Sequence, residues 1–493
     1  MSTPTRPVYL DYAATTPVDP AVAALMGECL GAEGSFGNPA SQHAYGAAAA
    51  RRIATARAQV AALIGAQPEE IVFTSGATES NNLAILGVAR ASADRGRHVV
   101  TLRTEHKAVL DPCRHLERRG ATVTYLTPDA SGRLSPAALA AALRPDTVLV
   151  SIMAANNETG VLQDLAALGG VCRERGIPLH TDAAQAAGRV PLDVRQLPVQ
   201  LLSLTAHKLY GPKGVGALYV RRGARGLLQP ILFGGGQERG LRPGTLPVHQ
   251  IAGFGAACEL VATSLAAESV RLSALTERLW RGLSALEEVY LNGADAARVP
   301  GILSVAFAGV EGESLVSGLA GLALATGAAC NSQSREPSYV LRALGRDPRL
   351  AESSLRFSLG RYSSEADVER AVAEVSAAVR RLRALSPALP APPLTGGPLV
   401  SGEAGSLAEG TWVRFHLATA GNSVKDARFQ AFACPHTMDV AAWLCAQLPG
   451  RAREQLLPGE PRQWAEARGV PVEKLGRLLL VEDALRACLA QWT

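Results

Sequence analysis

A lysine stands between a strand-like run and a glycine-rich loop in the stretch Ser203 to Gly214, which reads SLTAHKLYGPKG. We predict that Lys208 lies at the carboxyl end of a sheet strand, beside small residues and a histidine. An amine placed there can form a Schiff base with an aldehyde cofactor. Because an arbitrary lysine is usually a solvated loop residue, this interpretation depends on what accompanies Lys208.

Two further strand ends carry residues that suit the same cofactor. The run Ile71 to Thr74 leads into a Ser-Gly-Ala-Thr turn that opens a helix, where free backbone N–H groups and the Thr78 hydroxyl can hold a phosphate. Asp182, in HTDAAQ, ends another strand, where a carboxylate can keep a pyridine nitrogen protonated. Each feature alone is a common cap or turn. The phosphate turn, Asp182 and Lys208 in this order indicate a pyridoxal-phosphate site.

On these residues the chain resembles the cysteine desulfurases, fold-type I pyridoxal-phosphate enzymes of the class V aminotransferase superfamily. The resemblance covers residues 7–386 nearly continuously and rests on the segments PVYLDYAATTPVDP, GNPAS, IVFTSGATESNNLAI, TEHKAVLD, NNETG, HTDAAQ, AHKLYGPKGVGALYVRR, GGGQERGLRPGTLPVHQ, EGESL, EPSYVLRALG and SSLRFSLGR. It implies an enzyme that removes sulfur from L-cysteine, releases L-alanine and supplies iron–sulfur cluster assembly, with tRNA thiolation as a further outlet. A selenocysteine lyase or another class V enzyme is the alternative in the same fold.

The resemblance implies a role for each residue of the site. Lys208 would hold pyridoxal 5'-phosphate and move protons at the substrate α-carbon, and Arg356 would take the substrate carboxylate in a bidentate fork. The residues implied around the pyridine ring are His106, which stacks on it, Asp182 at its nitrogen, Gln185 at its phenolic oxygen, and Asn157 beside it and the substrate. Those implied around the phosphate are Ala77, Thr78, Thr205, His207 and, from the neighbouring subunit of a homodimer, Thr245.

Cys330 lies in LATGAACNSQSREP, a stretch of small and polar residues that predicts a mobile loop. A thiolate there could attack the sulfur of a substrate cysteine and become a persulfide. The resemblance assigns the nucleophile to this position and implies direct delivery to iron–sulfur scaffolds or other acceptor proteins. It also implies that Cys330 ligates a metal only transiently, through its persulfide. No permanent metal site is expected. The cysteines predicted to be inert core residues are Cys29, Cys113, Cys172, Cys258, Cys445 and Cys488.

An α/β fold must position these residues. Strand-like runs alternate with Ala-rich helical segments between about residues 50 and 260, a pattern typical of a mostly parallel sheet covered on both faces. The runs are 70–74, 98–103, 121–126, 147–153, 178–181, 201–204 and 217–220. A long helix over about 260–290 and later short strands predict a small α+β lobe. We therefore predict a desulfurase unit over 1–385, made of a large cofactor domain over about 15–260 and a small lobe from the N-terminus and about 261–385.

A composition break follows this unit. The segment SPALPAPPLTGGP, residues 386–398, has five prolines among thirteen positions and no charged residue, which is typical of a semi-rigid spacer. We predict a Pro/Gly-rich linker over 386–402 and a separate small α+β domain over 403–493. A strand over Trp412–Ala418 and a helix over Met438–Gln447 are expected in that domain.

The predicted C-terminal domain resembles, more weakly, the iron–sulfur cluster scaffold fold. Only Cys434 falls on a cysteine of that family, and Gly476 and Arg477 stand where its His-Cys pair is expected. One thiolate cannot supply the ligands of a cluster. We therefore interpret the domain as a degenerate docking module. The alternative is that Cys434 accepts the persulfide sulfur from Cys330.

Composition limits the classes of protein that remain. The 493 residues exceed the roughly 250–300 at which one hydrophobic core stops growing, so at least two domains are expected. The net charge of +5 is too small and dispersed to predict a nucleic-acid partner. The N-terminus lacks a signal-peptide pattern and apolar runs are short, so we expect a cytoplasmic protein without a membrane partner. A different class of function, a sulfur-delivery or assembly factor acting through its C-terminal docking domain, is the second alternative.

Overall fold

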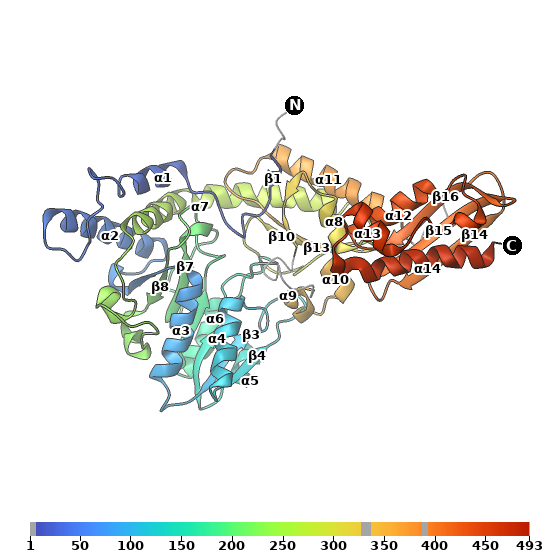
Figure 1. Cartoon of the computed structure of the whole chain (residues 1–493). Helices are drawn as coiled ribbons and strands as arrows, with labels where there is room; N and C mark the ends of the chain where they lie inside the picture. Colours follow the sequence, from blue (N-terminus) through green and yellow to red (C-terminus); the bar gives the residue numbers. More distant parts are fainter. Residues whose placement is uncertain (1–5, 327–336, 387–392, 493) are drawn as a thin grey trace.

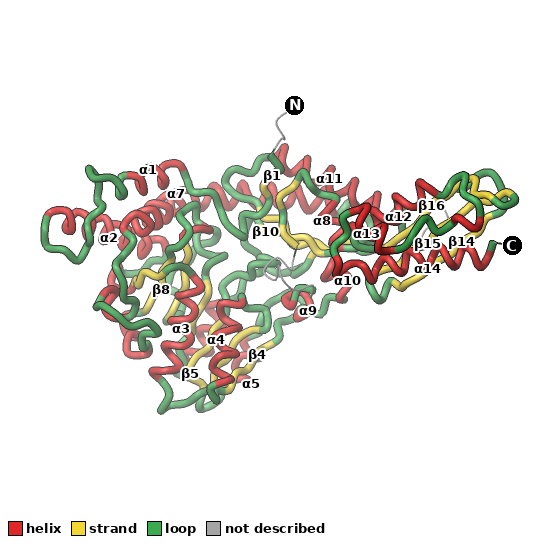
Figure 2. Tube along the Cα trace, viewed as in Figure 1, coloured by secondary structure: helices red, strands yellow, loops and turns green. Residues whose placement is uncertain are grey.

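The computed structural model describes residues 6–326, 337–386 and 393–492. Figure 1 shows an elongated molecule in which a large α/β body, a smaller lobe and the C-terminal elements follow one another. Figure 2 separates their layers: helices lie on both sides of the strands in the large body, and the C-terminal strands are flanked by helices. The predicted α/β class is confirmed.

The large body is built on a seven-stranded sheet in the order β2-β8-β7-β6-β5-β3-β4, in which only β8 runs antiparallel to its neighbours. Its strands are β2 (Ile71–Thr74), β3 (His98–Leu102), β4 (Thr122–Leu126), β5 (Thr147–Ser151), β6 (Leu179–Asp182), β7 (Leu201–Thr205) and β8 (Gly216–Val220). Six of the seven are buried at every residue, as expected where helices cover both faces.

Two hydrophobic clusters lie on opposite faces of this sheet. Residues of α3 (Ala77–Ala91) and α4 (Lys107–Arg118) form one cluster with the strands. The other is formed by residues of α2 (Ala44–Leu63), α5 (Pro136–Ala142), α6 (Leu165–Glu174) and the first half of α7 (Val248–Leu283). The arrangement leaves the carboxyl ends of the parallel strands open, which is where ligands bind in sheets of this kind.

The second half of α7 belongs to the small lobe. Leu272, Leu275 and Leu279 pack there in a separate cluster, whereas Ile251 and Phe254 pack in the large body. The helix begins at Val248, twelve residues before the start that the sequence predicted, because its first half is needed to cover the sheet. By length and composition α7 could cross a membrane, but 44% of its apolar window is buried inside the molecule, and core helices pass the same test.

The small lobe contains a four-stranded sheet in the order β12-β13-β10-β9. Its strands are β9 (Val289–Leu291), β10 (Ile302–Phe307), β12 (Ala325–Thr326) and β13 (Ser354–Ser358), and its helices besides α7 are α8 (Gly312–Ser317), α9 (Tyr339–Ala343), α10 (Pro348–Glu352) and α11 (Glu365–Arg383). The N-terminal strand β1 (Val8–Tyr9) pairs in parallel with β11 (Leu322–Ala323), which brings the start of the chain into this lobe. Helix α1 (Pro20–Gly27) then returns the chain to the large body, where it packs against α7.

The C-terminal elements form a third hydrophobic cluster around an antiparallel sheet in the order β14-β15-β16. The strands are β14 (Leu399–Ser406), β15 (Thr411–Ala420) and β16 (Ser423–Phe432), and the helices are α12 (Pro435–Gln447), α13 (Pro461–Arg468) and α14 (Leu475–Gln491). Strand β14 was not predicted, and it begins inside the range expected to be linker. Its sequence LVSGEAGS has no apolar alternation; eight pairs with β15 and the close approach of Gly402 to the α14 backbone hold it instead.

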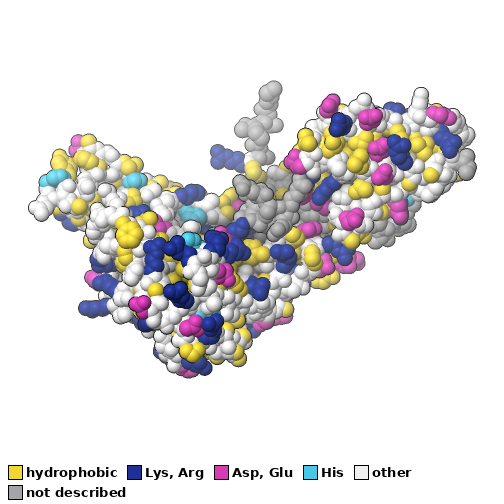
Figure 3. Space-filling model, turned by 60° about the horizontal axis from the view of Figure 1, so that its bottom comes forward, with side chains coloured by type: hydrophobic (Ala, Val, Ile, Leu, Met, Phe, Trp, Pro, Cys, Tyr) yellow, Lys and Arg dark blue, Asp and Glu magenta, His cyan; other side chains and the backbone are white. Residues whose placement is uncertain are grey.

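The third cluster docks on the small lobe through polar contacts. The Ser314 hydroxyl of α8 donates to the Ala433 carbonyl at 2.7 Å, and the Lys474 ammonium lies 2.5 Å from a Glu313 carboxylate oxygen. The Ala431 amide donates to the Leu385 carbonyl at 2.8 Å. On the face drawn in Figure 3, Lys and Arg side chains gather over the large body, whereas both signs alternate over the C-terminal part. This agrees with the equal numbers of basic and acidic residues beyond position 385.

Candidate active site

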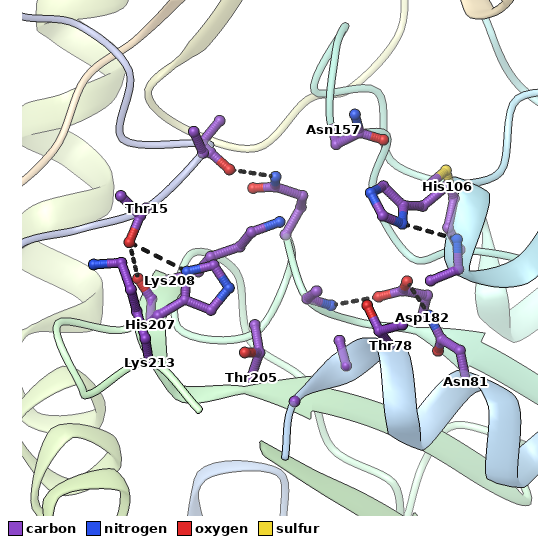
Figure 4. Close-up of a pocket in the computed structure, with 18 of the residues that line it drawn as sticks. Thr15, Thr78, Asn81, His106, Asn157, Asp182, Thr205, His207, Lys208 and Lys213 are labelled. Carbon is purple, nitrogen blue, oxygen red and sulfur yellow. Dashed lines mark hydrogen bonds between the residues drawn. The ribbon is translucent and has the colours of Figure 1, made fainter. Parts of the chain in front are cut away.

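The carboxyl ends of the parallel strands open into a cavity of about 610 Å³ (Figure 4). Ten of the residues that the resemblance singled out line it: Ala77, Thr78, His106, Asn157, Asp182, Gln185, Thr205, His207, Lys208 and Arg356. The first nine come from the large body, and Arg356 comes from β13 of the small lobe. The cavity therefore lies where the two parts of the first unit meet.

One end of the cavity is suited to an anion. Helix α3 begins there at Ala77, directly after Gly76, and no side chain caps its N-terminus. The amides of the first turn therefore face the cavity together with the Thr78 hydroxyl, and the helix dipole adds positive potential. Strand β8 passes closely behind this turn. A Cβ atom at Gly216 would lie 2.6 Å from the Gly76 Cα, so a glycine is required at position 216.

Asp182 is held in place at the end of β6 by two donors. The Asn81 side-chain amide donates to one carboxylate oxygen at 2.7 Å, and the Ala184 backbone amide donates to the other at 2.9 Å. The carboxylate is buried, with only 6% of the residue exposed. A fixed acceptor of this kind can hold a protonated ring nitrogen.

Two side chains flank the cavity above Asp182. His106 caps α4, and its Nδ1 accepts the Ala108 amide at 3.1 Å. Burial lowers the pKa of His106, with Lys208 acting in the same direction and Asp182 against it, so a neutral ring faces the cavity at neutral pH. The Gln185 side-chain amide donates to the Ala13 carbonyl at 2.9 Å, and its Oε1 is buried without a hydrogen-bond partner among the described residues.

Lys208 follows β7 in a single turn of 3-10 helix and extends into the cavity (Figure 4). The neighbouring His207 has its Nδ1 3.2 Å from the Thr15 hydroxyl, and its carbonyl accepts the Thr16 amide at 2.9 Å. Burial, together with Lys208 and Lys213, lowers the pKa of His207 to about 4, so this ring is neutral as well. The N-terminal segment thus fixes the turn that carries the lysine.

Arg356 reaches the cavity from the opposite side and is only 4% exposed. One terminal nitrogen donates to the Asn157 carbonyl at 2.8 Å, and the other lies 2.7 Å from an Asp11 carboxylate oxygen. Its Nε is buried without a hydrogen-bond partner within the described residues. The guanidinium is therefore oriented from two directions and keeps a donor for a carboxylate ligand.

Two predicted residues are not found in this cavity. Thr245 is exposed and does not line it, so a phosphate contact by Thr245 would require a second subunit. Cys330 and its predicted mobile loop lie in 327–336, outside the described residues.

Sequence reasoning did not single out Asp11, Thr15, Asn81 and Lys213, although all four lie in segments that carried the resemblance. Asn81 and Lys213 share their segments with predicted site residues, and this is the signal that could have found them.

The other cysteines are buried, as predicted for Cys29, Cys113, Cys172, Cys258, Cys445 and Cys488. Burial raises the pKa of Cys113 and Cys172 to about 12, so neither is a thiolate at neutral pH. Cys434 is also fully buried, at the start of α12, with its sulfur 3.3 Å from the Thr437 hydroxyl. Across residues 6–326, 337–386 and 393–492 no group of three or more His, Cys, Asp and Glu side chains is placed to hold a metal ion.

Arg477, at a position where the expected scaffold resemblance calls for a cysteine, lies at the interface between the small lobe and the C-terminal cluster. Burial lowers its pKa, but the Cys434 thiol and the Glu313 and Glu311 carboxylates outweigh this and raise it. Gly476 is exposed beside it. Arg477 therefore contributes a cation to the docked interface.

The donor set fits pyridoxal phosphate. The uncapped helix start suits the phosphate, the fixed Asp182 carboxylate suits the ring nitrogen, and the amine of Lys208 lies within the same cavity. The orphaned Gln185 oxygen requires a donor that the described chain does not provide.

Comparison with known proteins places the first unit in a family. The model of the class V aminotransferases matches residues 8–371. The cysteine desulfurase IscS of Pectobacterium atrosepticum is 55% identical over 382 residues, which are 77% of this chain and 95% of that relative. The corresponding protein of Aeromonas hydrophila is 56% identical over the same shares.

Solved structures agree with this placement. A NifS-like protein superposes with a TM-score of 0.70 at 35% identity, covering 76% of this chain and all of that one. The structure of DndA from Streptomyces lividans has a TM-score of 0.61 at 44% identity, over 71% of this chain and 99% of its own. SspA, solved in complex with cysteine, has a TM-score of 0.65 at 39% identity, over 72% of this chain and 99% of its own.

Proposed function

Because the chain belongs to the class V aminotransferase family, we propose that it is a pyridoxal-phosphate-dependent cysteine desulfurase, which converts L-cysteine to L-alanine and retains the sulfur as a persulfide on Cys330. The observation that carries the proposal is the convergence of Lys208, Asp182 and Arg356 on one cavity. These three supply an amine, a fixed carboxylate and a guanidinium, which suit an aldehyde cofactor, its ring nitrogen and an amino-acid carboxylate.

Bound pyridoxal phosphate supplies an electron sink that weakens bonds at the α- and β-carbons of an attached amino acid. Asp182 maintains that sink by keeping a positive charge on the ring nitrogen, and Asn81 and Ala184 fix the carboxylate that does so. Lys208 holds the cofactor and afterwards moves a proton at the α-carbon of the substrate. His106, whose pKa is lowered by burial, would stack on the ring in its neutral form and would add no competing charge.

Arg356 orients the substrate. Asp11 and the Asn157 carbonyl hold its two terminal nitrogens, so the side chain loses little further freedom when a carboxylate binds. Asn157 lies beside both the cofactor and the amino acid.

The sulfur leaves by transfer to Cys330. Its thiolate attacks the substrate sulfur, a sulfur–sulfur bond forms, and the carbon–sulfur bond breaks with its electron pair going to carbon. The β-carbon then takes a proton, so L-cysteine and the Cys330 thiol give L-alanine and a Cys330 persulfide. The two sulfurs lose the two electrons that the β-carbon gains, so the step balances without an external oxidant.

Several finer features belong to the same proposal. The enzyme acts in the cytoplasm as a homodimer in which Thr245 of each subunit completes the phosphate site of the other. The persulfide supplies iron–sulfur cluster assembly and, as a further outlet, tRNA thiolation. Residues 1–385 form the catalytic unit, 386–402 the linker, and 403–493 a scaffold-like domain.

We propose docking as the role of residues 403–493, which is supported by the contacts of α8 with Ala433 and Lys474, residues that shortly precede α12 and α14. Sulfur acceptance by Cys434 is the alternative. Its thiol is buried under the docked interface, so acceptance would require this interface to open.

The test incubates the holoprotein with L-cysteine and measures alanine. We expect stoichiometric alanine with wild-type protein and none above background with Lys208→Ala. As a control, Lys213→Ala removes the other cavity lysine and should still turn over. Undiminished alanine formation by Lys208→Ala would exclude the proposed chemistry.

A further inference from the structure

Ser338 and Tyr339, which closely follow residues 327–336, are bound to residues next to the lining of the cofactor cavity. Ser338 is 3% exposed, and its hydroxyl donates to a Glu158 carboxylate oxygen at 2.5 Å. The same hydroxyl accepts the Leu341 amide at 3.1 Å and so caps α9. The next residue, Tyr339, donates its hydroxyl to the Glu105 carbonyl at 2.8 Å. Two consecutive side chains thus fix the point at which the chain leaves residues 327–336.

Glu158 is unusual because it is a carboxylate buried to 2% exposure that does not itself line the cavity. Asn156 holds its backbone: the Asn156 side-chain oxygen accepts the Glu158 amide at 2.9 Å and the Thr159 amide at 3.0 Å. Burial raises the pKa of Glu158 to about 7, against the opposing effects of Ser338 and Arg356. A group that is costly to bury is retained here, and among the described side chains its hydrogen bond is to the anchor of the Cys330 segment.

The turn that contains Glu158 also carries a substrate contact. Its neighbour Asn157 lines the cavity, and the Asn157 carbonyl accepts a terminal nitrogen of Arg356 at 2.8 Å. Asn157 and Glu158 are neighbours in the chain, and together they bind Arg356, which orients the substrate, and Ser338, which closely follows residues 327–336.

We propose that Glu158 is a positioning residue for sulfur transfer. By binding the Ser338 hydroxyl, its carboxylate holds the residue that follows the Cys330 segment, residues 327–336, next to the turn that orients the substrate. This inference rests on the proposed function, in which Cys330 receives the sulfur. It assigns Glu158 no contact with the reacting atoms. The role is confined to the transfer step, because proton movement at the α-carbon by Lys208 does not require Cys330.

The experiment separates these two steps in the holoenzyme. Sulfur transfer is followed as alanine formed from L-cysteine, and the α-carbon step is followed as exchange of the L-alanine α-proton with deuterium from D₂O. We expect Glu158→Ala and Ser338→Ala each to slow sulfur transfer by about tenfold, the loss typical of one hydrogen bond to a charged group. α-Proton exchange should keep its wild-type rate in both variants.

Coupling and rescue complete the test. The double variant should be no slower than either single variant, and Ser338→Thr, which keeps the hydroxyl, should retain sulfur transfer. Ser135→Ala removes an equivalent serine cap from a different helix, α5. It should leave the rates of sulfur transfer and of α-proton exchange unchanged. If Glu158→Ala does not fold, Ser338→Ala alone makes the comparison, and Glu158→Gln, whose amide oxygen can still accept the Ser338 hydroxyl, should retain sulfur transfer.

Three results would overturn the inference: unchanged sulfur transfer in Ser338→Ala, additive losses in the double variant, or parallel losses of transfer and exchange.

The variant Cys330→Ala distinguishes a failure of this inference from a failure of the proposed function. If Cys330→Ala still forms alanine at the wild-type rate, the proposed function fails. If Cys330→Ala is inactive and the Glu158 and Ser338 variants transfer normally, only the positioning role fails.

Discussion

At the scale of single residues, the site depends on side chains that are themselves held by others. Asp182 is fixed by Asn81, Arg356 by Asp11, and His207 by Thr15. None of these three supports carries out a chemical step in the proposed mechanism. They keep the groups that do so in one geometry, which is what electrostatic and proximity effects require.

Replacing Asp182 by Asn removes the charge that holds the ring nitrogen. We expect the rate of alanine formation to fall by about 10- to 100-fold, the equivalent of one charge-assisted hydrogen bond. Asn81→Ala leaves Asp182 charged but without one donor, and we expect a smaller loss, about tenfold or less. Steady-state alanine assays of the two holoproteins make the comparison. A greater loss in Asn81→Ala than in Asp182→Asn would contradict the assigned order.

His180 predicts a pH dependence of stability. It is fully buried, with its ring nitrogens 2.8 Å from the Ser151 hydroxyl and 3.0 Å from the Ser203 hydroxyl. Burial lowers its pKa to about 4, against the effect of Asp182. An unfolded histidine titrates near 6.5, so as the pH falls from about 6.5 to 4 the unfolded chain takes up the proton first, and the free energy of unfolding decreases.

The variant His180→Gln cannot take up this proton. Between pH 7.5 and 5 we expect wild type to lose about 1 to 2 kcal/mol more unfolding free energy than the variant. Comparing the two proteins by urea unfolding at both pH values cancels the opposite contribution of Glu158, whose pKa is raised. Equal changes in the two proteins would show that His180 is not held neutral.

At the scale of elements, α7 joins the large body to the small lobe. Its first half packs in the core of the large body and its second half in the small lobe, so the two cores share one continuous helix. The cavity lies between these parts, with Lys208 on one side and Arg356 on the other. A rigid shared helix keeps that separation constant.

Leu279, fully buried in the second half of α7, tests this coupling. We expect Leu279→Ala to cost about 2–5 kcal/mol of stability, as is usual for a leucine removed from a core. Because the helix is shared, hydrogen exchange should accelerate together in β10 of the small lobe and β3 of the large body. Val270→Ala, an exposed position on the same helix, serves as the control. Loss of protection in β10 alone would mean that the two cores unfold independently.

The elements also show which parts of the fold are predictable from sequence. The buried strands of the large sheet read as continuous apolar runs because both faces are covered, and they were predicted to within a few residues. Strand β14 could not be, because its glycines and serines carry no pattern and pairing with β15 holds it. The supports of the site were missed for a similar reason: Asn81 lies 101 residues from Asp182, and Asp11 lies 345 residues from Arg356. Contacts over such separations are made by topology.

At the scale of the whole molecule, the described residues that line the cavity lie between positions 11 and 356, whereas the C-terminal elements dock at the far side of the small lobe. A chain that ends at residue 385 should therefore form alanine from L-cysteine at the full rate. We expect the shortened chain to differ from the full chain only in the delivery of sulfur to an acceptor protein. Alanine assays on the two chains test this, and loss of turnover in the shorter one would give residues 403–493 a catalytic role.

The proposed homodimer can be tested separately through Thr245, because Thr245 does not line the cavity of its own chain. In the proposed homodimer, a Lys208→Ala subunit can lend its Thr245 to a Thr245→Ala subunit that keeps Lys208. Mixing the two inactive or impaired proteins under conditions of subunit exchange should restore roughly a quarter of the wild-type activity. No recovery, with exchange verified by mass, would contradict the shared phosphate site.

The most direct test of the central claim is the location of the sulfur after a single turnover. The holoenzyme is given one equivalent of L-cysteine per subunit, alkylated under non-reducing conditions, and its peptides are weighed by mass spectrometry. We predict one added sulfur on the peptide that contains Cys330, in an amount equal to the alanine released, and none on Cys434 while the C-terminal cluster stays docked. Wild-type release of alanine and sulfide by Cys330→Ala, without sulfur on any cysteine, would contradict the account.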